Sequence, residues 1–291
     1  MRHKSSRPAD LHIIVRKVKY DYYSALKHTK YWFNNDPIVS HFFNALQSTF
    51  PEGEKLFIQA ALDSAEQLVR KKKLTPQLKE DMQNFIKQEA LHSQQHQLWT
   101  NALIDLGYKK MAKYAGQLKQ LSSGFRKIFP PVLRLSITAA AEHYTATLAY
   151  IFTNVTPEIL TKSLVEFRGL LLYHAMEELE HKSVCFDLYQ ELSGNYLGRI
   201  FGLFFATFDL IINIYIRFRY LMRKDGIWNK DNKRNFRSFL IGKRGLITGL
   251  LSRIKSYLKP SFHPWQTDDR ELINQRFHKY QKELKIKPFE M

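Results

Sequence analysis

Apolar positions recur at helical spacing over four long stretches of the chain, with turn-forming residues between them. The pattern predicts helices over residues 36–69, 75–107, 132–152 and 156–192, three of which begin with a proline, the residue favoured in a first helical turn. Residues 108–129 are predicted to form a connection.

This pattern and the composition together indicate one helical protein. Only 12 Gly and 10 Pro occur in 291 residues, and 44% of the residues are apolar, enough for a sizeable core. We predict an all-α fold with a four-helix bundle over residues 35–195, a basic N-terminal lead-in over 1–34, and an apolar helix plus basic amphipathic extension over 196–291.

The predicted fourth helix contains the first candidate chemistry. His174, Glu178 and His181 are spaced by four and three residues, so their side chains fall within an arc of roughly 60° on one helix face. Two imidazoles and a carboxylate on one face suit a metal ion such as Fe, Mn or Zn. Such a triplet also occurs by chance on ordinary helices, so partners elsewhere in the chain are needed.

Those partners occur at matching intervals. Glu89 and His92 form a second Glu-x-x-His, and lone glutamates stand 35 residues before Glu89, at Glu54, and 36 residues before Glu178, at Glu142. A di-metal four-helix bundle takes one Glu from each of two helices and Glu-x-x-His from each of the other two. The spacing therefore predicts a ferritin-like di-metal bundle.

Position within this pattern assigns the roles. Glu89 and Glu178 are predicted to bridge the two metals, and Glu54 and Glu142 to bind terminally, with one nitrogen per metal from each Glu-x-x-His. The expected metal ligands are Glu54, Glu89, His92, Glu142, His174, Glu178 and His181, and the four glutamates are also expected to carry the chemistry.

Several neighbours of these residues leave alternatives open. His174 is either an extra ligand or a packed histidine, and His96 is either a ligand or a hydrogen-bonding partner of one. Glu52 is a rival to Glu54, but it points about 200° away on the same helix. Glu177, Glu180 and His143 stand one residue off the ligand faces, where they are surface or supporting groups, and a kink is expected beside Pro51 and Gly53.

The net charge of +18 calls for an acidic partner. Between Arg217 and Lys259 the chain has seven Arg and six Lys against two Asp. This block lacks a recognised nucleic-acid motif, so nucleic acid is the weaker candidate. The single cysteine excludes an internal disulfide, and no apolar segment follows the basic N-terminus. We therefore expect a cytoplasmic protein.

A membrane is the alternative partner for the C-terminal third. Residues 197–216 form an apolar run about 30 Å long as a helix, interrupted by polar residues. Either this run packs on the bundle as a fifth helix, or it contacts the inner face of a membrane or embeds in it. Residues 239–258 interleave Leu and Ile with basic residues, which is typical of an amphipathic helix on anionic lipid or of a solvated helix packed on the bundle.

Five segments of the sequence stand out together: Phe50-Pro51-Glu52-Gly53-Glu54, Gln88-Glu89 with His92 and His96, Glu142-His143, residues 177–184, and Phe262-His263-Pro264-Trp265. They resemble a known family, the bacterial proteins described as predicted metal-dependent hydrolases, over residues 35–270. Tyr173 stands where that family usually has Trp. The ligand pattern is also similar to that of the arylamine N-oxygenases, di-iron enzymes in which a histidine at the place of His174 implies a third nitrogen ligand.

Four carboxylates balance the charge of two divalent ions, so the site is predicted to hold two metals. Carboxylate-rich ligation favours two Fe ions, with Mn or Zn as alternatives. We therefore expect a di-iron oxygenase or oxidase that uses O2, an electron donor and an unknown small or lipid-like substrate. The alternatives are a dinuclear metal-dependent hydrolase and a non-catalytic metal-binding protein on an anionic membrane surface.

Overall fold

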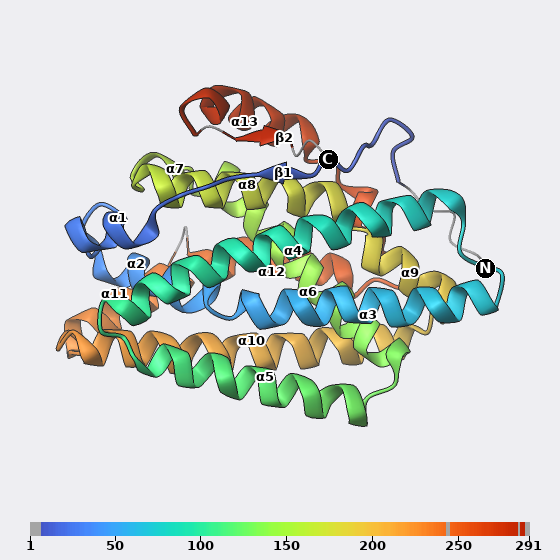
Figure 1. The fold of residues 1–291 in the computed structure, drawn as a ribbon, viewed down its shortest axis with the longest axis horizontal. Helices are drawn as coiled ribbons and strands as arrows, with labels where there is room; N and C mark the ends of the chain where they lie inside the picture. The colour runs from blue at the N-terminus through green and yellow to red at the C-terminus, as the bar shows by residue number, and fades with distance from the viewer. Residues whose placement is uncertain (1–6, 243–244, 285, 289–291) are drawn as a thin grey trace.

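Helices dominate the structure, a computed structural model that describes residues 7–242, 245–284 and 286–288 (Figure 1). The predicted all-α class is confirmed. In chain order the elements are β1 (Arg16–Lys17), α1 (Tyr22–His28), α2 (Pro37–Gln47), α3 (Phe50–Arg70), α4 (Pro76–Asp105), α5 (Lys110–Ile128), α6 (Pro131–Tyr150), a π-helical turn (Ile151–Val155), α7 (Glu158–Thr161), α8 (Val165–His181), α9 (Val184–Leu192), α10 (Tyr196–Lys224), α11 (Lys230–Ile241), α12 (Leu246–Tyr257), a 3₁₀ turn (Pro264–Gln266), α13 (Arg270–Leu284) and β2 (Lys287–Pro288).

Four helices that carry the candidate ligands pack in a closed ring. Helix α3 contacts α4 and α6, and α8 contacts the same two helices from the other side. Figure 1 shows α3, α4 and α8 running roughly along the long axis of the molecule. The ring brings four separate stretches of sequence around one interior, while the ferritin-like relationship itself stays a prediction.

The expected single helix over residues 36–69 is two helices. Its predicted start is correct, since the Asp36 side chain accepts hydrogen bonds from the first backbone N–H groups and Pro37 follows. The chain then breaks between α2 and α3, because Pro51 lacks an N–H and its ring collides with the carbonyl four residues earlier. The expected kink is therefore a full break, and Ser48 and Thr49 bond back to carbonyls of the last turn of α2.

The expected helix over residues 156–192 is divided into α7, α8 and α9. Residues 162–164 leave helical geometry because they pair with residues 32–34: Asn34 N donates to the Lys162 carbonyl and Leu164 N to the Trp32 carbonyl. The second break, at Lys182 and Ser183, is where the segment 262–267 docks. Tertiary contacts thus override a helical pattern at both places.

Two further segments also differ from their predictions. Residues 108–129, predicted as a connection, form α5, because Met111, Tyr114 and Leu118 give this stretch a helical apolar face. Within 239–258, α11 ends at Ile241 and α12 begins at Leu246, and the pair 243–244 lies outside the described residues.

The lead-in and the C-terminal region both pack on the ring. In the lead-in, Tyr22 stacks on Trp99 of α4, and β1 pairs with β2 next to α8 (Figure 1). Helix α10 packs on α6 and α2, as the fifth-helix interpretation predicted. It lies so close to α6 that a Cβ atom on Gly202 would be 2.6 Å from the carbonyl oxygen of Ser136.

Candidate metal centre

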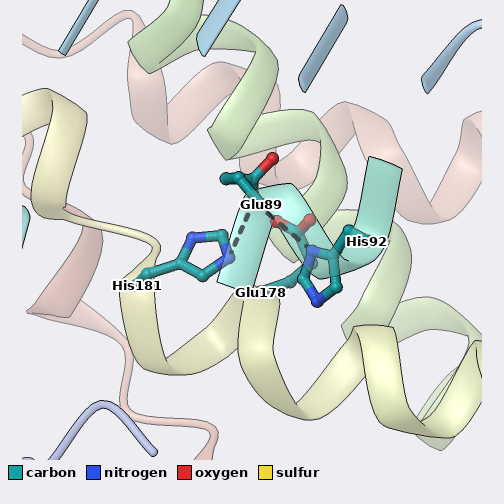
Figure 2. Close-up of side chains that lie close together, drawn as sticks. All are labelled: Glu89, His92, Glu178 and His181. Atoms are coloured by element: carbon teal, nitrogen blue, oxygen red, sulfur yellow. Dashed lines mark ion pairs between the residues drawn. The ribbon is translucent and has the colours of Figure 1, made fainter. Parts of the chain in front are cut away.

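The two Glu-x-x-His motifs face each other across the interior, one on α4 and one on α8. Glu89, His92 and His181 are fully buried, and Glu178 is nearly so. The donor atoms of these four side chains lie within 4.8 Å of one another. Figure 2 shows the two imidazoles approaching Glu89, with His181 Nε2 3.1 Å and His92 Nδ1 3.4 Å from its Oε1.

A second donor group lies beside the first and consists of Glu54, His96 and His174. Glu54 Oε1 is 3.6 Å from His96 Nε2 and 3.7 Å from His174 Nε2. The two groups meet at Glu178, whose Oε1 is 2.8 Å from His174 Nε2. The structure therefore brings His96, left open by the sequence, to the same place as His174.

Glu142 reaches the first group through an imidazole. Its Oε2 lies 2.8 Å from His181 Nδ1, while His181 Nε2 faces Glu89. A carboxylate on the far nitrogen of a metal-binding histidine fixes the ring's tautomer and orientation. The predicted terminal-ligand role of Glu142 stays a prediction, and in this geometry the residue orients His181.

Glu177 is the residue that sequence reasoning undervalued. Its side chain is fully buried, so a surface position is wrong for it, and Glu180 and His143 are also buried. Glu177 Oε2 lies 2.9 Å from His92 Nε2. Glu177 therefore contacts the ring of His92 in the same way that Glu142 contacts the ring of His181. The only signal in the sequence was the density of acids in residues 177–180.

Arg16 of the lead-in supports these extra carboxylates. Its backbone N–H donates to Glu177 Oε1 at 2.8 Å, and its guanidinium binds both oxygens of Glu180 at 2.6 and 3.0 Å. The backbone carbonyl of Arg16 also accepts a hydrogen bond from the Tyr173 hydroxyl. One cation thus pairs with two acids that flank the donor groups.

The interior of the site is rich in buried polar atoms that lack a hydrogen-bond partner among the described residues. Such atoms cost free energy of about 1–3 kcal/mol each when they stay unpaired, and more when charged. Cations that accept several oxygen and nitrogen donors at once would satisfy them, so the residues present fit a metal centre. The atoms without a hydrogen bond are both oxygens of Glu54 and Glu89, both nitrogens of His92 and His96, Glu142 Oε1, His174 Nε2, Glu177 Oε2 and His181 Nε2. Several of them lie at ion-pair distance from one another without making a hydrogen bond.

The protonation of the carboxylates reflects the same crowding. Burial raises the pKa of Glu54 well above its ordinary value, and burial also raises the pKa of Glu142 to about 8. Burial acts to raise the pKa of Glu89 as well, but the adjacent imidazoles of His181 and His92 outweigh it and lower that pKa to about 2. The site without cations therefore holds protons that divalent ions would displace.

A small apolar cavity ends on the second donor group. Its volume is about 30 Å³, room for roughly one water molecule. His96, His174 and Glu178 form its polar end, where Thr145 Oγ1 donates a hydrogen bond to Glu178 Oε2. The other lining residues are Phe43, Leu46, Gln47, Phe50, Leu148, Ala149, Phe152, Leu170, Leu171 and Ala175.

Two residues near the predicted ligands lie outside the donor groups. Glu52, the rival of Glu54, forms an ion pair with Lys55 at 2.7 Å. His263 packs in its loop and lies 2.9 Å from Asp187 Oδ1. Trp265 next to it donates to Ser183 at the α8–α9 break. The Phe-His-Pro-Trp segment therefore supports the end of the helix that carries His181.

Comparison with known proteins identifies the family. A family model described as "Predicted metal-dependent hydrolase" matches residues 14–268, which include every candidate ligand. No curated protein and no solved structure matches the chain.

Proposed function

Because the chain belongs to the family of predicted metal-dependent hydrolases, we propose that it is a hydrolase with a dinuclear metal centre inside the α3–α4–α6–α8 ring. The observation that carries the proposal is the pair of buried donor groups that meet at Glu178. A dinuclear arrangement fits the charge, because Glu54, Glu89, Glu142 and Glu178 together match two divalent cations.

One ion would be held by Glu89, His92, Glu178 and His181, and the other by Glu54, His96 and His174. Two divalent ions supply Lewis acidity and lower the pKa of a bound water to near neutrality. The chain's own residues supply the rest of the arrangement. Glu142 and Glu177 fix the rings of His181 and His92.

The cavity beside the second donor group indicates the class of substrate. Its walls are aliphatic and aromatic, and the polar atoms gather at the end formed by His96, His174 and Glu178. The cavity has room for a group of about the size of one methyl next to a scissile bond. We therefore propose small esters or amides of short-chain acids such as acetate, with the methyl group in this cavity.

A di-iron oxygenase or oxidase is the second candidate function, and the kinds of ligand atom in the site support it. All donors are carboxylates and imidazoles, without a thiolate, and two Glu-x-x-His motifs face each other, which is the ligand pattern of di-iron bundles. His174 lies 2.8 Å from Glu178 Oε1, where it would add a further nitrogen ligand. This candidate requires O2 and an electron donor, neither of which hydrolysis needs.

One experiment tests the centre itself. The protein is purified anaerobically and its metals are measured, with Glu54→Ala compared with Glu52→Ala. The wild type is expected to hold about two divalent ions per chain, and Glu54→Ala to lose about one of them. Glu52→Ala should keep both, because Glu52 pairs with Lys55 outside the site. Equal metal content in the two variants would overturn the assignment.

A second experiment separates the two candidate activities. The metal-loaded protein is assayed without O2 against p-nitrophenyl acetate, p-nitrophenyl butyrate and bis-p-nitrophenyl phosphate. Anaerobic hydrolysis that is lost in Glu89→Ala supports the hydrolase. Absence of hydrolysis overturns it, and iron with reductant-dependent O2 uptake would then establish the second candidate.

A further inference from the structure

One face of α10 is apolar and open to solvent. Exposure reaches 75% at Leu197, 66% at Phe204, 70% at Phe208 and 61% at Ile211. The opposite face buries Leu203, Phe218 and Leu221, and α10 packs on α6 and α2. The exposed residues are spaced by three and four positions, which places them in one row along the helix. The α10 stripe consists of Leu197, Phe201, Phe204, Phe208, Ile211 and Tyr215.

The stripe is widened by the neighbouring helix α5. Leu121 and Ile128 of α5 are 66% and 76% exposed. Phe125 of α5 contacts Phe205 of α10, with 5.5 Å between ring centroids, so the two helices are in contact there. Figure 1 shows α5 and α10 running along the same edge of the molecule. An exposed apolar surface of this extent is unusual on a protein that has no partner there.

A groove between α5 and α10, the basic groove, lies at one end of the stripe. Its volume is about 880 Å³, and Tyr215 belongs to both the stripe and the groove. Lys110 Nζ lies 5.7 Å from the centroid of the Tyr220 ring. The basic residues of the groove form no ion pair with an acid among the described residues, and Arg219 Nε lacks a hydrogen-bond partner among them. The lining residues are Gly107, Lys109, Lys110, Tyr114, Tyr215, Ile216, Arg219, Tyr220, Arg223 and Lys224.

The charge of this surface selects its occupant. A second copy of the chain in a symmetric dimer would bring an equally basic groove to the contact, and like charges oppose such pairing. An anionic phospholipid leaflet offers both complements, acyl chains for the aromatic stripe and phosphates for the unpaired cations. Tyr215 lies where the stripe meets the groove. A tyrosine suits the headgroup level of a membrane, because its ring is apolar and its hydroxyl can contact water.

We infer that the α10 stripe and the basic groove dock the protein on an anionic phospholipid surface. Helix α10 lies in the plane of the interface and does not cross the bilayer. It is the one helix among the described residues with the length and composition to span a membrane, but crossing would remove Phe218 and Leu221 from the core. Asp209, the acid within this helix, accepts a hydrogen bond from Asn213.

The test is co-sedimentation of the full chain, loaded with metal, with vesicles. Phosphatidylcholine vesicles are compared with vesicles that also contain about 30% phosphatidylglycerol, at low and high salt. The protein should partition onto the anionic vesicles, and salt should weaken the binding. Failure to bind anionic vesicles at low salt overturns the inference.

Paired variants test the residues. Phe204→Ser with Phe208→Ser should lower the partition coefficient about tenfold or more, and Arg219→Gln with Arg223→Gln by a similar factor. Val69→Ser and Arg70→Gln on α3 are matched controls, since Val69 is 61% exposed and Arg70 is also on the surface. Equal losses in the controls would overturn the inference.

Folding and assembly are checked on the same samples. Circular dichroism and thermal unfolding confirm that each variant keeps its fold, and light scattering gives the mass in solution. A dimer that Phe208→Ser converts to monomers would overturn the inference and assign the stripe to a contact between copies. The readout is vesicle binding, so it is independent of the proposed hydrolase activity.

Discussion

Arg16→Ala tests how the lead-in supports the metal centre. The guanidinium of Arg16 lies 2.6 Å from Glu180 Oε1 and 3.6 Å from Glu177 Oε1, and all three side chains are largely buried. Removal of one partner from a buried ion pair leaves an uncompensated charge and costs about 3–5 kcal/mol. Since 1 kcal/mol shifts the melting temperature of a chain of this size by about 2–4 °C, we expect a fall of at least roughly 6 °C.

The same variant should weaken metal binding. Glu177 lies against His92, and loss of a group that orients a metal-binding histidine lowers affinity about 10–100-fold. Thermal unfolding is therefore measured with and without added divalent metal, and affinity by titration with a competing chelator. Arg16→Ala combined with Glu180→Gln is the control, because neutralising the acid should recover part of the lost stability. If Arg16→Ala lowers the free energy of unfolding by less than about 1 kcal/mol and leaves the metal affinity unchanged, this reasoning is refuted.

Three further predictions test other parts of the structure. Asp225 accepts hydrogen bonds from several groups, including His41, and although burial acts to raise the pKa of Asp225, these bonds lower it. The stability that Asp225 adds should be complete above about pH 4 and should be lost as the pH falls further. The free energy of urea unfolding of Asp225→Asn should therefore differ from that of the wild type at pH 7 and converge with it in acid. Gly202→Ala should destabilise the protein by about 1–3 kcal/mol, because the added Cβ collides with α6. Gly116→Ala is the control: its Cβ meets nothing within 4 Å, so it should stabilise the protein by up to about 1 kcal/mol. Equal shifts of the melting temperature in the two variants would contradict the close α10–α6 contact. Phe152→Ala should enlarge the cavity and raise kcat/KM for the butyrate ester relative to the acetate ester, and an unchanged ratio would remove the cavity from the substrate path.

The parts of the site that follow helical periodicity were predictable from sequence. Glu89 and His92, and Glu178 and His181, need only local helix to share a face, and the structure brings all four together. Glu54 and His174 were also predicted, and they meet in the second group with His96. The role of His96 could not be decided from the sequence. Helical periodicity places His96 on the same face as Glu89 and His92, but it does not show how far along the helix the second donor group extends.

Glu177 could not be assigned from sequence for a different reason. It points about 100° away from Glu178 on the same helix, and its burial needs a second segment besides His92 of α4. That segment is the lead-in, whose Arg16 lies 161 residues earlier. Burial of an acid by a distant cation leaves no local pattern in the chain.

The helix boundaries show the same dependence on distant contacts. The pattern over 156–192 is helical throughout, yet residues 162–164 turn away to pair with residues 32–34, and the chain breaks again where Trp265 meets Ser183. Both breaks flank α8, which carries His174, Glu178 and His181. The two ends of the chain thus fix the length and position of the helix with the most ligands. The lead-in and the C-terminal loop therefore support the candidate metal centre from outside the ring of helices that forms it.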